Sequence, residues 1–243
     1  ASRGNRDLAG RMLTMVAGLT PEGLRWKWEQ ALLARELGLE ELFVEALNTL
    51  IREGRQVNDA LWVLEAHEGE DAGRVLARLD PENREAYLRW LMRWRRADDA
   101  VLAWQSLDAA KREEEDLRLL FIHFLIGNNR MDMARELCKE EGIANPGFEG
   151  DLTRRGFDWR FNDREGEWRI QQVSAPVRSG RKALEVRFSG KANSRFRHVY
   201  QLVPVTAGKD FRLSFWWKSH RITTDQGGFV EVRGRGCKGL DEK

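Results

Sequence analysis

Cysteine is scarce in this sequence, which holds only Cys138 and Cys237 among its 243 residues. The two lie far apart, and neither belongs to a Cys-x-x-Cys or Cys/His pattern with the spacing of zinc ligands. Long apolar runs are absent as well, since no stretch of about 18 apolar residues occurs. These absences argue against a zinc site and against a transmembrane helix in this chain.

The motifs of the common catalytic sites are also missing. The four histidines show neither a His-Glu-x-x-His pattern nor a triad context, and there is no Gly-x-Ser-x-Gly motif and no phosphate-binding glycine loop. Acidic residues gather between 158 and 167, but as neighbours in one loop. A glycosidase needs two carboxylates that face each other across a cleft. We therefore predict no catalytic residues and a protein that is not an enzyme.

Charge is nearly balanced over the whole chain, with 41 Lys and Arg against 39 Asp and Glu, but it is unevenly distributed. Residues 145–243 carry 20 basic and 12 acidic side chains, a net charge of +8, whereas residues 1–144 carry a net charge of −6. A basic region favours acidic polymers such as nucleic acid, acidic polysaccharide or anionic lipid. Dispersed, solvated arginines explain the same count, so both interpretations stay open.

The first part of the chain, from about residue 6 to 142, has the periodicity of amphipathic helices. Apolar residues recur at i, i+3 and i+4, as in Leu39, Leu42, Phe43, Ala46, Leu47 and Leu50. Short breaks separate these stretches at Gly38, Gly54, Gly69, Asp80-Pro81 and Gly127-Asn128-Asn129. Proline just after aspartate is typical of a helix start. The pattern predicts a succession of helices joined by tight turns.

Part of this region repeats. A shift of 34 residues places Tyr87, Leu88, Leu91, Arg96, Asp98 and Ala100 on Phe121, Ile122, Leu125, Arg130, Asp132 and Ala134. An earlier copy over 47–60 lies 40 residues upstream of the first. A period of 34 in helix–turn–helix units resembles the tetratricopeptide repeats, of which this would be a divergent member. The resemblance implies an α-solenoid over residues 1–142 with a concave groove that holds a protein partner.

Six of the ten tryptophans lie in the helical part. Tryptophan at helical spacing is more often a core residue than a ligand platform, so we predict that these side chains are core. Trp90 and Trp94 are four residues apart and share a helix face, with Arg93, Arg95 and Arg96 beside them. Stacking of these indoles against guanidinium groups is the alternative.

The stretch 142–149 divides the chain into two predicted domains, 1–142 and 145–243. Gly142 stands where a helix C-cap favours glycine, and Pro146 biases Asn145 away from the helical region. After this point, apolar residues alternate with polar ones, which predicts strands over 183–188, 199–205, 211–218 and 229–232. The fold class expected for the whole chain is multidomain α + β, with helical hairpins followed by an antiparallel β-sandwich.

A second resemblance is carried by several segments of this part: Asn145-Pro146-Gly147-Phe148-Glu149, Phe157-Asp158-Trp159, and the stretches 180–186, 199–205 and 211–215. Together they resemble the opening of a carbohydrate-binding-module jelly roll of the galactose-binding-like type. Pro146 departs from the small residue usual there. The residues after 144 are too few for the whole fold, so the resemblance implies an incomplete sandwich whose last strands either follow Lys243 or are disordered.

The same resemblance implies two sites. Sugars stack on exposed aromatic rings in such modules, and Trp216 alternates out of the predicted core with Arg212 on the same face of its strand. We therefore expect carbohydrate at Trp216 and Arg212. Related modules hold a structural calcium ion near their start, which by position implies Glu149 as a ligand, although calcium needs several further oxygen ligands.

The function expected from these observations is that of a binding protein without catalytic activity. The helical repeats would engage a protein partner and the β-sandwich would bind polysaccharide. The resemblances place such a protein in a bacterial periplasm or cell envelope, or in polysaccharide export. Two alternatives stay open. One is an assembly scaffold whose β part is purely structural. The other is nucleic-acid binding through the basic β part, which ranks below the scaffold because no nucleic-acid motif accompanies the basic residues.

Overall fold

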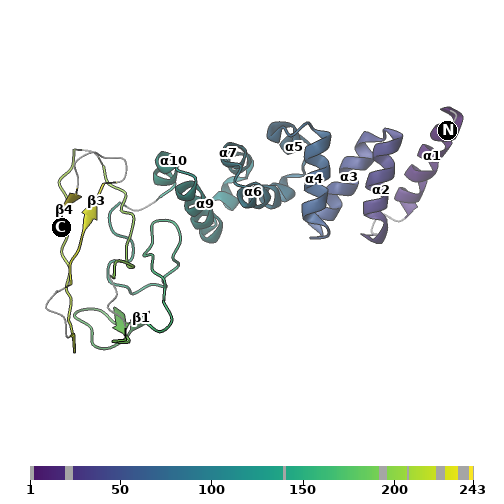
Figure 1. Cartoon of the computed structure of the whole chain (residues 1–243). Coiled ribbons are helices and arrows are strands. Elements are labelled where there is room, and N and C mark those ends of the chain that lie inside the picture. Colours follow the sequence, from purple (N-terminus) through teal and green to yellow (C-terminus); the bar gives the residue numbers. More distant parts are fainter. Residues whose placement is uncertain are drawn as a thin grey trace.

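The computed structural model describes residues 3–19, 24–138, 141–191, 196–206, 208–222, 228–234 and 241–242, so Cys237 lies outside the described residues. Figure 1 shows a row of helices that starts with α1 (Arg3–Leu19) at the N-terminus. At the opposite end of the row lies a region of mostly extended chain that holds the C-terminus. The chain is therefore mixed α and β, as predicted at this level, with helices first and small antiparallel sheets later.

The helices follow one another closely. After α1 come α2 (Leu24–Leu37), α3 (Glu40–Arg52), α4 (Val57–His67), α5 (Ala72–Arg78), the 3₁₀ turn η1 (Pro81–Asn83), α6 (Arg84–Arg93), α7 (Ala97–Ser106), α8 (Ala109–Glu113), α9 (Glu115–Gly127) and α10 (Met131–Glu136). As expected, Pro81 opens a helical segment. In the described part of the chain, no helix combines the length and the apolar character needed to cross a bilayer.

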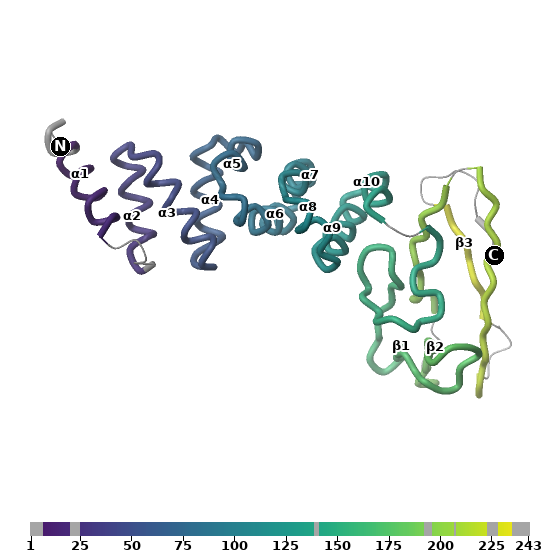
Figure 2. Tube along the Cα trace, turned by 180° about the vertical axis from the view of Figure 1, so that it is seen from behind, coloured from purple at the N-terminus to yellow at the C-terminus, as the bar shows by residue number. Residues whose placement is uncertain are grey.

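Successive helices stack on each other, as α2 does on α3, α6 on α7 and α9 on α10 (Figure 2). Their apolar faces form one core that runs along the row. Trp104 of α7 and Phe121 of α9 illustrate how neighbouring pairs are joined, since their rings stack with centroids 4.5 Å apart. Each helix thus buries its apolar stripe against helices close to it in the sequence.

Five of the helix ends close in the same way. The backbone N–H of Leu39, Arg55, Glu70, Arg96 and Arg130 each donates to the carbonyl five residues earlier, at 2.8–3.1 Å. This is the bond of the Schellman motif, in which the preceding residue adopts the left-handed conformation. That residue is Gly38, Gly54, Gly69, Arg95 and Asn129 in turn, each with φ between +56° and +73°. Four of the five breaks in the sequence pattern are therefore helix C-termini, at Gly38, Gly54, Gly69 and Gly127-Asn128-Asn129, whereas Asp80-Pro81 marks a helix start.

The positions matched by the 34-residue shift share burial. Tyr87 and Phe121 are both fully buried, and so are the pairs Leu91–Leu125 and Ala100–Ala134. The matched arginines both reach back about one hairpin, Arg96 to Glu65 and Arg130 to Asp98. The two copies of the repeat thus share the burial of their apolar residues and the backward ion pair of their arginines.

The C-terminal part contains two short antiparallel pairs among the described residues. Strand β1 (Trp168–Val173) pairs with β2 (Ala183–Phe188), with Trp168 opposite Phe188 and Val173 opposite Ala183. Strand β3 (Val232–Arg233) pairs with β4 (Asp241–Glu242). The strand predicted over 183–188 is therefore confirmed, whereas β1 was not predicted. Three residues, Phe161, Trp168 and Ile170, form the buried centre of this part.

Two of the predicted strands are wrong. The segment 199–205 forms only an isolated bridge between Tyr200 and Arg160, and 211–218 belongs to no strand. The strand expected over 229–232 is reduced to β3. A strand exists only where a second segment supplies backbone hydrogen bonds, and within the described residues no ladder forms beside 211–218. No closed sandwich is therefore seen in the described part of the chain.

The stretch between the two parts also differs from expectation. Helix α10 ends at Glu136, so Gly142 is not a helix cap, and its N–H donates instead to the carbonyl of Pro204 at 3.3 Å. Asn145 precedes proline but adopts φ +44°. Its side-chain amide donates to the Gly150 carbonyl and accepts from the Gly150 N–H, at 3.0 and 3.1 Å. These side-chain bonds hold Asn145 in a conformation that asparagine tolerates better than most residues.

The C-terminal part packs against the end of the helical row. Phe157 is buried within the helical core, and Leu202 lies partly buried against it. A Cβ at Gly156 would lie 3.4 Å from Leu119 of α9. The connection is therefore an apolar contact as well as a covalent link.

Candidate functional site

A cluster of three indoles lies where α4 meets α6. Trp90 is 3% exposed, whereas Trp62 and Trp94 are 46% and 51% exposed. The ring of Trp62 lies edge-on to both others, 5.1 Å from Trp90 and 5.5 Å from Trp94 between centroids. Core placement is confirmed for Trp90 and Trp104, and Trp28 packs partly buried against the core. It is wrong for Trp26, Trp62 and Trp94, which are exposed to solvent.

A buried polar network contacts Trp90, the buried member of this cluster. The Glu65 side chain is 1% exposed, accepts from the Tyr87 hydroxyl and lies 2.7 Å from Nη1 of Arg96. Arg96 Nε also donates to Asp99 at 2.7 Å, and its guanidinium lies 5.9 Å from the centre of the Trp90 ring. Burial, followed by the hydrogen bond to Glu65, raises the pKa of Tyr87 well above its ordinary value. Tyr87 therefore stays a neutral donor, and the network fixes Trp90 under the exposed pair.

Two arginines flank the exposed indoles. Arg93, on the last turn of α6, donates from Nη1 to the side-chain carbonyl of Asn58 at 3.3 Å. Asn58 lies one turn before Trp62 on α4, which places Arg93 beside that indole. Arg95 follows Trp94 directly and is exposed. We call Trp62, Trp94, Arg93 and Arg95 the indole surface.

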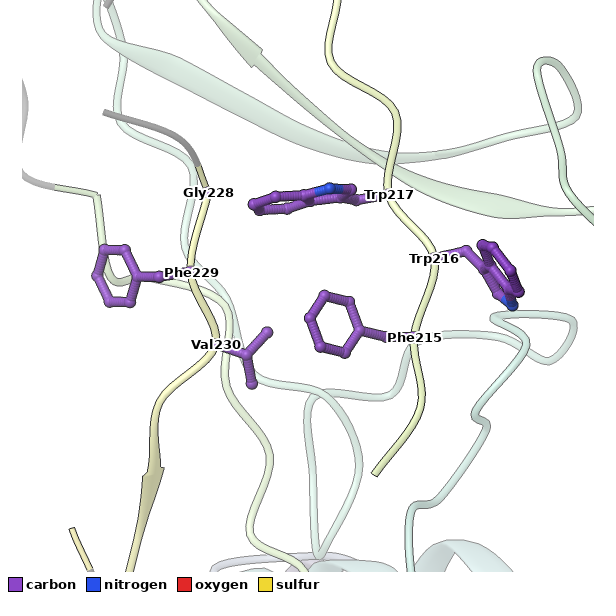
Figure 3. Close-up of a pocket in the computed structure, with 6 residues that line it drawn as sticks. All are labelled: Phe215, Trp216, Trp217, Gly228, Phe229 and Val230. Carbon is purple, nitrogen blue, oxygen red and sulfur yellow. The ribbon is translucent and has the colours of Figure 1, made fainter. Parts of the chain in front are cut away.

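The sugar site expected in the C-terminal part is only partly assembled. Trp216 is 76% exposed, and Figure 3 shows it on the opposite side of its segment from Phe215 and Trp217. The cation over its ring is Arg178, with Cζ 4.3 Å from the ring centre. Arg212 is exposed, and the described residues show no contact between it and Trp216. The alternation in the sequence predicted on which side of the segment Trp216 lies. It could not predict the contact with Arg178, which is 38 residues away in the sequence.

Phe215 and Trp217 border an open apolar groove. Figure 3 shows both side chains directed toward 228–230, where the Trp217 ring lies on Gly228 and Val230 faces Phe215. The groove has a volume of about 610 Å³. Its wall residues are exposed, most of them by about half or more. The alternation predicted for 211–217 therefore gives a two-sided segment, over which the described residues place no packed layer.

Glu149, the expected calcium ligand, lies at the turn before β2. Its Oε1 accepts from the backbone N–H of Arg181 at 2.8 Å and of Lys182 at 3.1 Å. These two bonds, the Arg181 amide first, lower the pKa of Glu149. Among the described residues, Glu149 belongs to no group of three metal-ligating side chains. The geometry is that of a carboxylate anchoring a turn, and calcium would require ligands that the described residues do not bring to it.

One group of three metal-ligating side chains does occur in the described part, formed by Glu40, His67 and Glu68. His67 Nε2 lies 3.0 Å from both carboxylate oxygens of Glu40. Arg78 lies 3.5 Å from Glu40 and 3.3 Å from Glu68. Because the Arg78 guanidinium pairs with both carboxylates, the arrangement fits an ion-pair cluster joining α3, α4 and α5.

Three of the four acidic residues at 158–167 have structural partners, namely Asp158, Asp163 and Glu167. Asp158 accepts from the backbone N–H of Thr153 at 2.6 Å and of Trp159 at 2.7 Å. Asp163 accepts from the N–H of Ile170 at 2.7 Å, and Glu167 pairs with Arg164 at 3.0 Å. These carboxylates hold turns and strand ends together, so they offer no convergent acid and base.

Comparison with known proteins adds no relative. No family model, no curated protein and no solved structure matches this chain. Among the surfaces described above, the indole surface is distinguished by its contact with the buried core residue Trp90.

Proposed function

We propose that this chain is a non-enzymatic binding protein whose helical part holds a protein partner. In this proposal the helices form a tetratricopeptide-like solenoid over 1–142, and 145–243 forms part of a β-sandwich. The observation that carries the proposal is the pair of exposed indoles, Trp62 and Trp94, on stacked helices. The burial shared by the positions of the 34-residue repeat supports the solenoid.

The composition of the indole surface supports a protein ligand. Tryptophan and arginine are the side chains that most often dominate the energy of protein interfaces, where they sit on rigid supports. Here the support is the buried network of Glu65, Tyr87 and Arg96. A preorganised aromatic surface loses little conformational entropy on binding.

A random-peptide phage library panned on the full chain tests the proposal. Clones are counter-selected on a Trp62→Ala/Trp94→Ala double variant, with Trp26→Ala as the matched control because Trp26 is also an exposed helical indole. We expect peptides that bind the chain and the control but lose binding to the double variant. Circular dichroism and thermal unfolding verify that the double variant is folded. Enrichment of no peptide that depends on these indoles would contradict the proposal.

A second candidate function is carbohydrate binding at Trp216. The exposed ring, held on one face by Arg178, supports it. It would accord with a place in a bacterial periplasm, cell envelope or polysaccharide export. On a glycan array we expect a signal that Trp216→Ala removes and Trp217→Ala, on the other side of the segment, retains. An array without signal would favour a structural β part, and oligonucleotide binding that weakens steeply with salt would favour the nucleic-acid alternative.

A further inference from the structure

We propose that the indole surface binds an acidic, proline-containing extended segment of a partner protein, an inference that rests on the proposed function of the helical part. It goes further in naming the chemistry of the ligand. Three observations carry it: the shape of the exposed indole pair, the charge around it, and the backbone conformation of Arg95.

The indoles define the apolar half of the ligand. Trp62 and Trp94 form a T-shaped pair inclined at 67°, and each ring is about half exposed. They therefore present an angled aromatic surface to a ligand instead of one flat platform. Prolyl rings stack on aromatic faces of this kind, and an extended proline-containing segment is already ordered before it binds. The exposed area thus suits a thin, stiff chain.

The charge around the indoles indicates that the ligand also carries acidic residues. Within the described residues, Arg93 donates to the neutral side chain of Asn58 and forms no ion pair, and Arg95 has no ion pair either. The nearby acids are already engaged: Glu65 and Asp99 with Arg96, and Asp98 with Arg130. Asp59 is the exposed acid next to Asn58. The guanidinium groups of Arg93 and Arg95 are therefore available to carboxylates, which they bind strongly and with defined geometry.

Arg95 adopts a left-handed backbone conformation that is unfavourable for arginine. It has φ +56°, at the position that glycine fills in three of the five Schellman turns and asparagine in a fourth. A side chain with a Cβ is disfavoured there, and arginine gains nothing from the turn itself. Within the described residues, its side chain makes no hydrogen bond that would offset this cost. A strained residue at an exposed surface points to a role outside the fold.

The test measures affinity and stability on the same variants of the full chain. The probe is a fluorescein-labelled peptide of about 12 residues that alternates glutamate and proline, and a lysine–proline peptide of equal length is the control. Fluorescence anisotropy gives Kd. We expect Arg95→Gly to weaken binding of the glutamate–proline peptide about tenfold and to raise Tm. Trp94→Ala should weaken binding at least as much.

Asn129→Gly is the matched variant, because Asn129 occupies the same turn position at the end of α9, away from the indoles. It should raise Tm without changing Kd. The proposal is overturned if Arg95→Gly leaves Kd unchanged, or if the lysine–proline peptide binds as well as the acidic one. Phage peptides that depend on Trp62 and Trp94 but carry no acidic residues would overturn this inference while leaving the proposed function intact. Absence of any indole-dependent peptide would remove both.

Discussion

The helical part and the C-terminal part contain similar apolar residues but bury them to different extents. Among the described residues, thirty buried hydrophobic side chains form the core along the helices and include Phe157 from the C-terminal part, whereas the separate C-terminal core has three. Leu91 and Phe121 are fully buried, while Leu213 and Phe211 are about half exposed. The C-terminal part is therefore not poor in apolar residues. Within the described residues, no neighbouring layer covers Phe211 and Leu213.

The difference follows from where each structure finds its partners. A helix satisfies its backbone internally and buries its stripe against helices adjacent in sequence. A strand needs both a hydrogen-bonded neighbour and a layer over its apolar face, and each can come from distant segments. Local periodicity is therefore enough to specify the helical row but leaves the C-terminal part dependent on additional contacts.

Truncation of an aromatic side chain in each part should show this contrast most strongly. Phe121→Ala removes a fully buried ring stacked on Trp104, and we expect a loss of about 4 kcal/mol in the free energy of unfolding. Phe211→Ala removes a half-exposed ring and should cost less than about 0.5 kcal/mol. Urea unfolding followed by circular dichroism at the helical band measures both. Equal losses would mean that Phe211 is packed as tightly as Phe121.

The buried ion pair gives the next largest effect. Arg96→Met leaves the Glu65 carboxylate buried without its cation, and we expect destabilisation of about 3 kcal/mol. Arg130→Met, at the matched position of the repeat, breaks a pair with exposed Asp98 and should cost under about 1 kcal/mol. Denaturant midpoints of the two variants compare them directly. Similar midpoints would contradict the assignment of Glu65 and Arg96 as a supporting network.

A turn from each part provides a smaller, more local comparison. Gly54 and Gly180 both have positive φ, but a Cβ has open space at Gly54 and collides with the Glu149 carboxylate at Gly180. Gly54→Ala should cost about 1 kcal/mol through backbone strain alone. Gly180→Ala should in addition break the bonds from Glu149 to the amides of Arg181 and Lys182. Faster hydrogen exchange at those two amides, absent in Gly54→Ala, is the expected result, and unchanged exchange would show that Glu149 does not hold this turn.

The smallest effect is a dependence of stability on pH through His123. Burial, and then the charges of Arg160 and Arg155 from the C-terminal part, lower the pKa of His123 below its ordinary value. The neutral form is therefore favoured in the folded state. Its stabilising contribution is complete above the unfolded pKa of about 6.5 and is lost as pH falls through the folded pKa. His123→Gln should flatten the decline of Tm between about pH 7 and 5, and an identical decline in both proteins would exclude this origin.

Sequence patterns predicted the helical part well because its determinants are local. The i, i+3, i+4 spacing located the helices, Asp80-Pro81 marked a start, and Gly38 and Gly54 marked ends that the structure closes with Schellman bonds. Exposure of Trp94 was not predictable, because its neighbour Trp62 lies on another helix. Arg95 was noticed beside the indoles, but its left-handed conformation is evident only from the turn that it closes.

In the C-terminal part, alternation predicted sidedness but not pairing. It placed Trp216 opposite Phe215 and Trp217, as Figure 3 shows, yet no ladder forms beside 211–218 among the described residues. Strand β1 was missed because Gln171 and Gln172 interrupt the apolar alternation after Ile170. The partners of Trp216 and Glu149 come from residues about 30 to 40 positions away, which sequence spacing cannot specify.

Hydrogen–deuterium exchange of the full chain, with and without the glutamate–proline peptide, tests the central claim that a self-sufficient helical scaffold carries the binding surface. The account predicts strong protection in α3, α6 and α9 and near-unprotected amides over 211–217 in the free chain. Added peptide should slow exchange around the end of α6 and leave 211–217 unchanged. Protection of 211–217 equal to that of α6, or a peptide response confined to the C-terminal part, would contradict it.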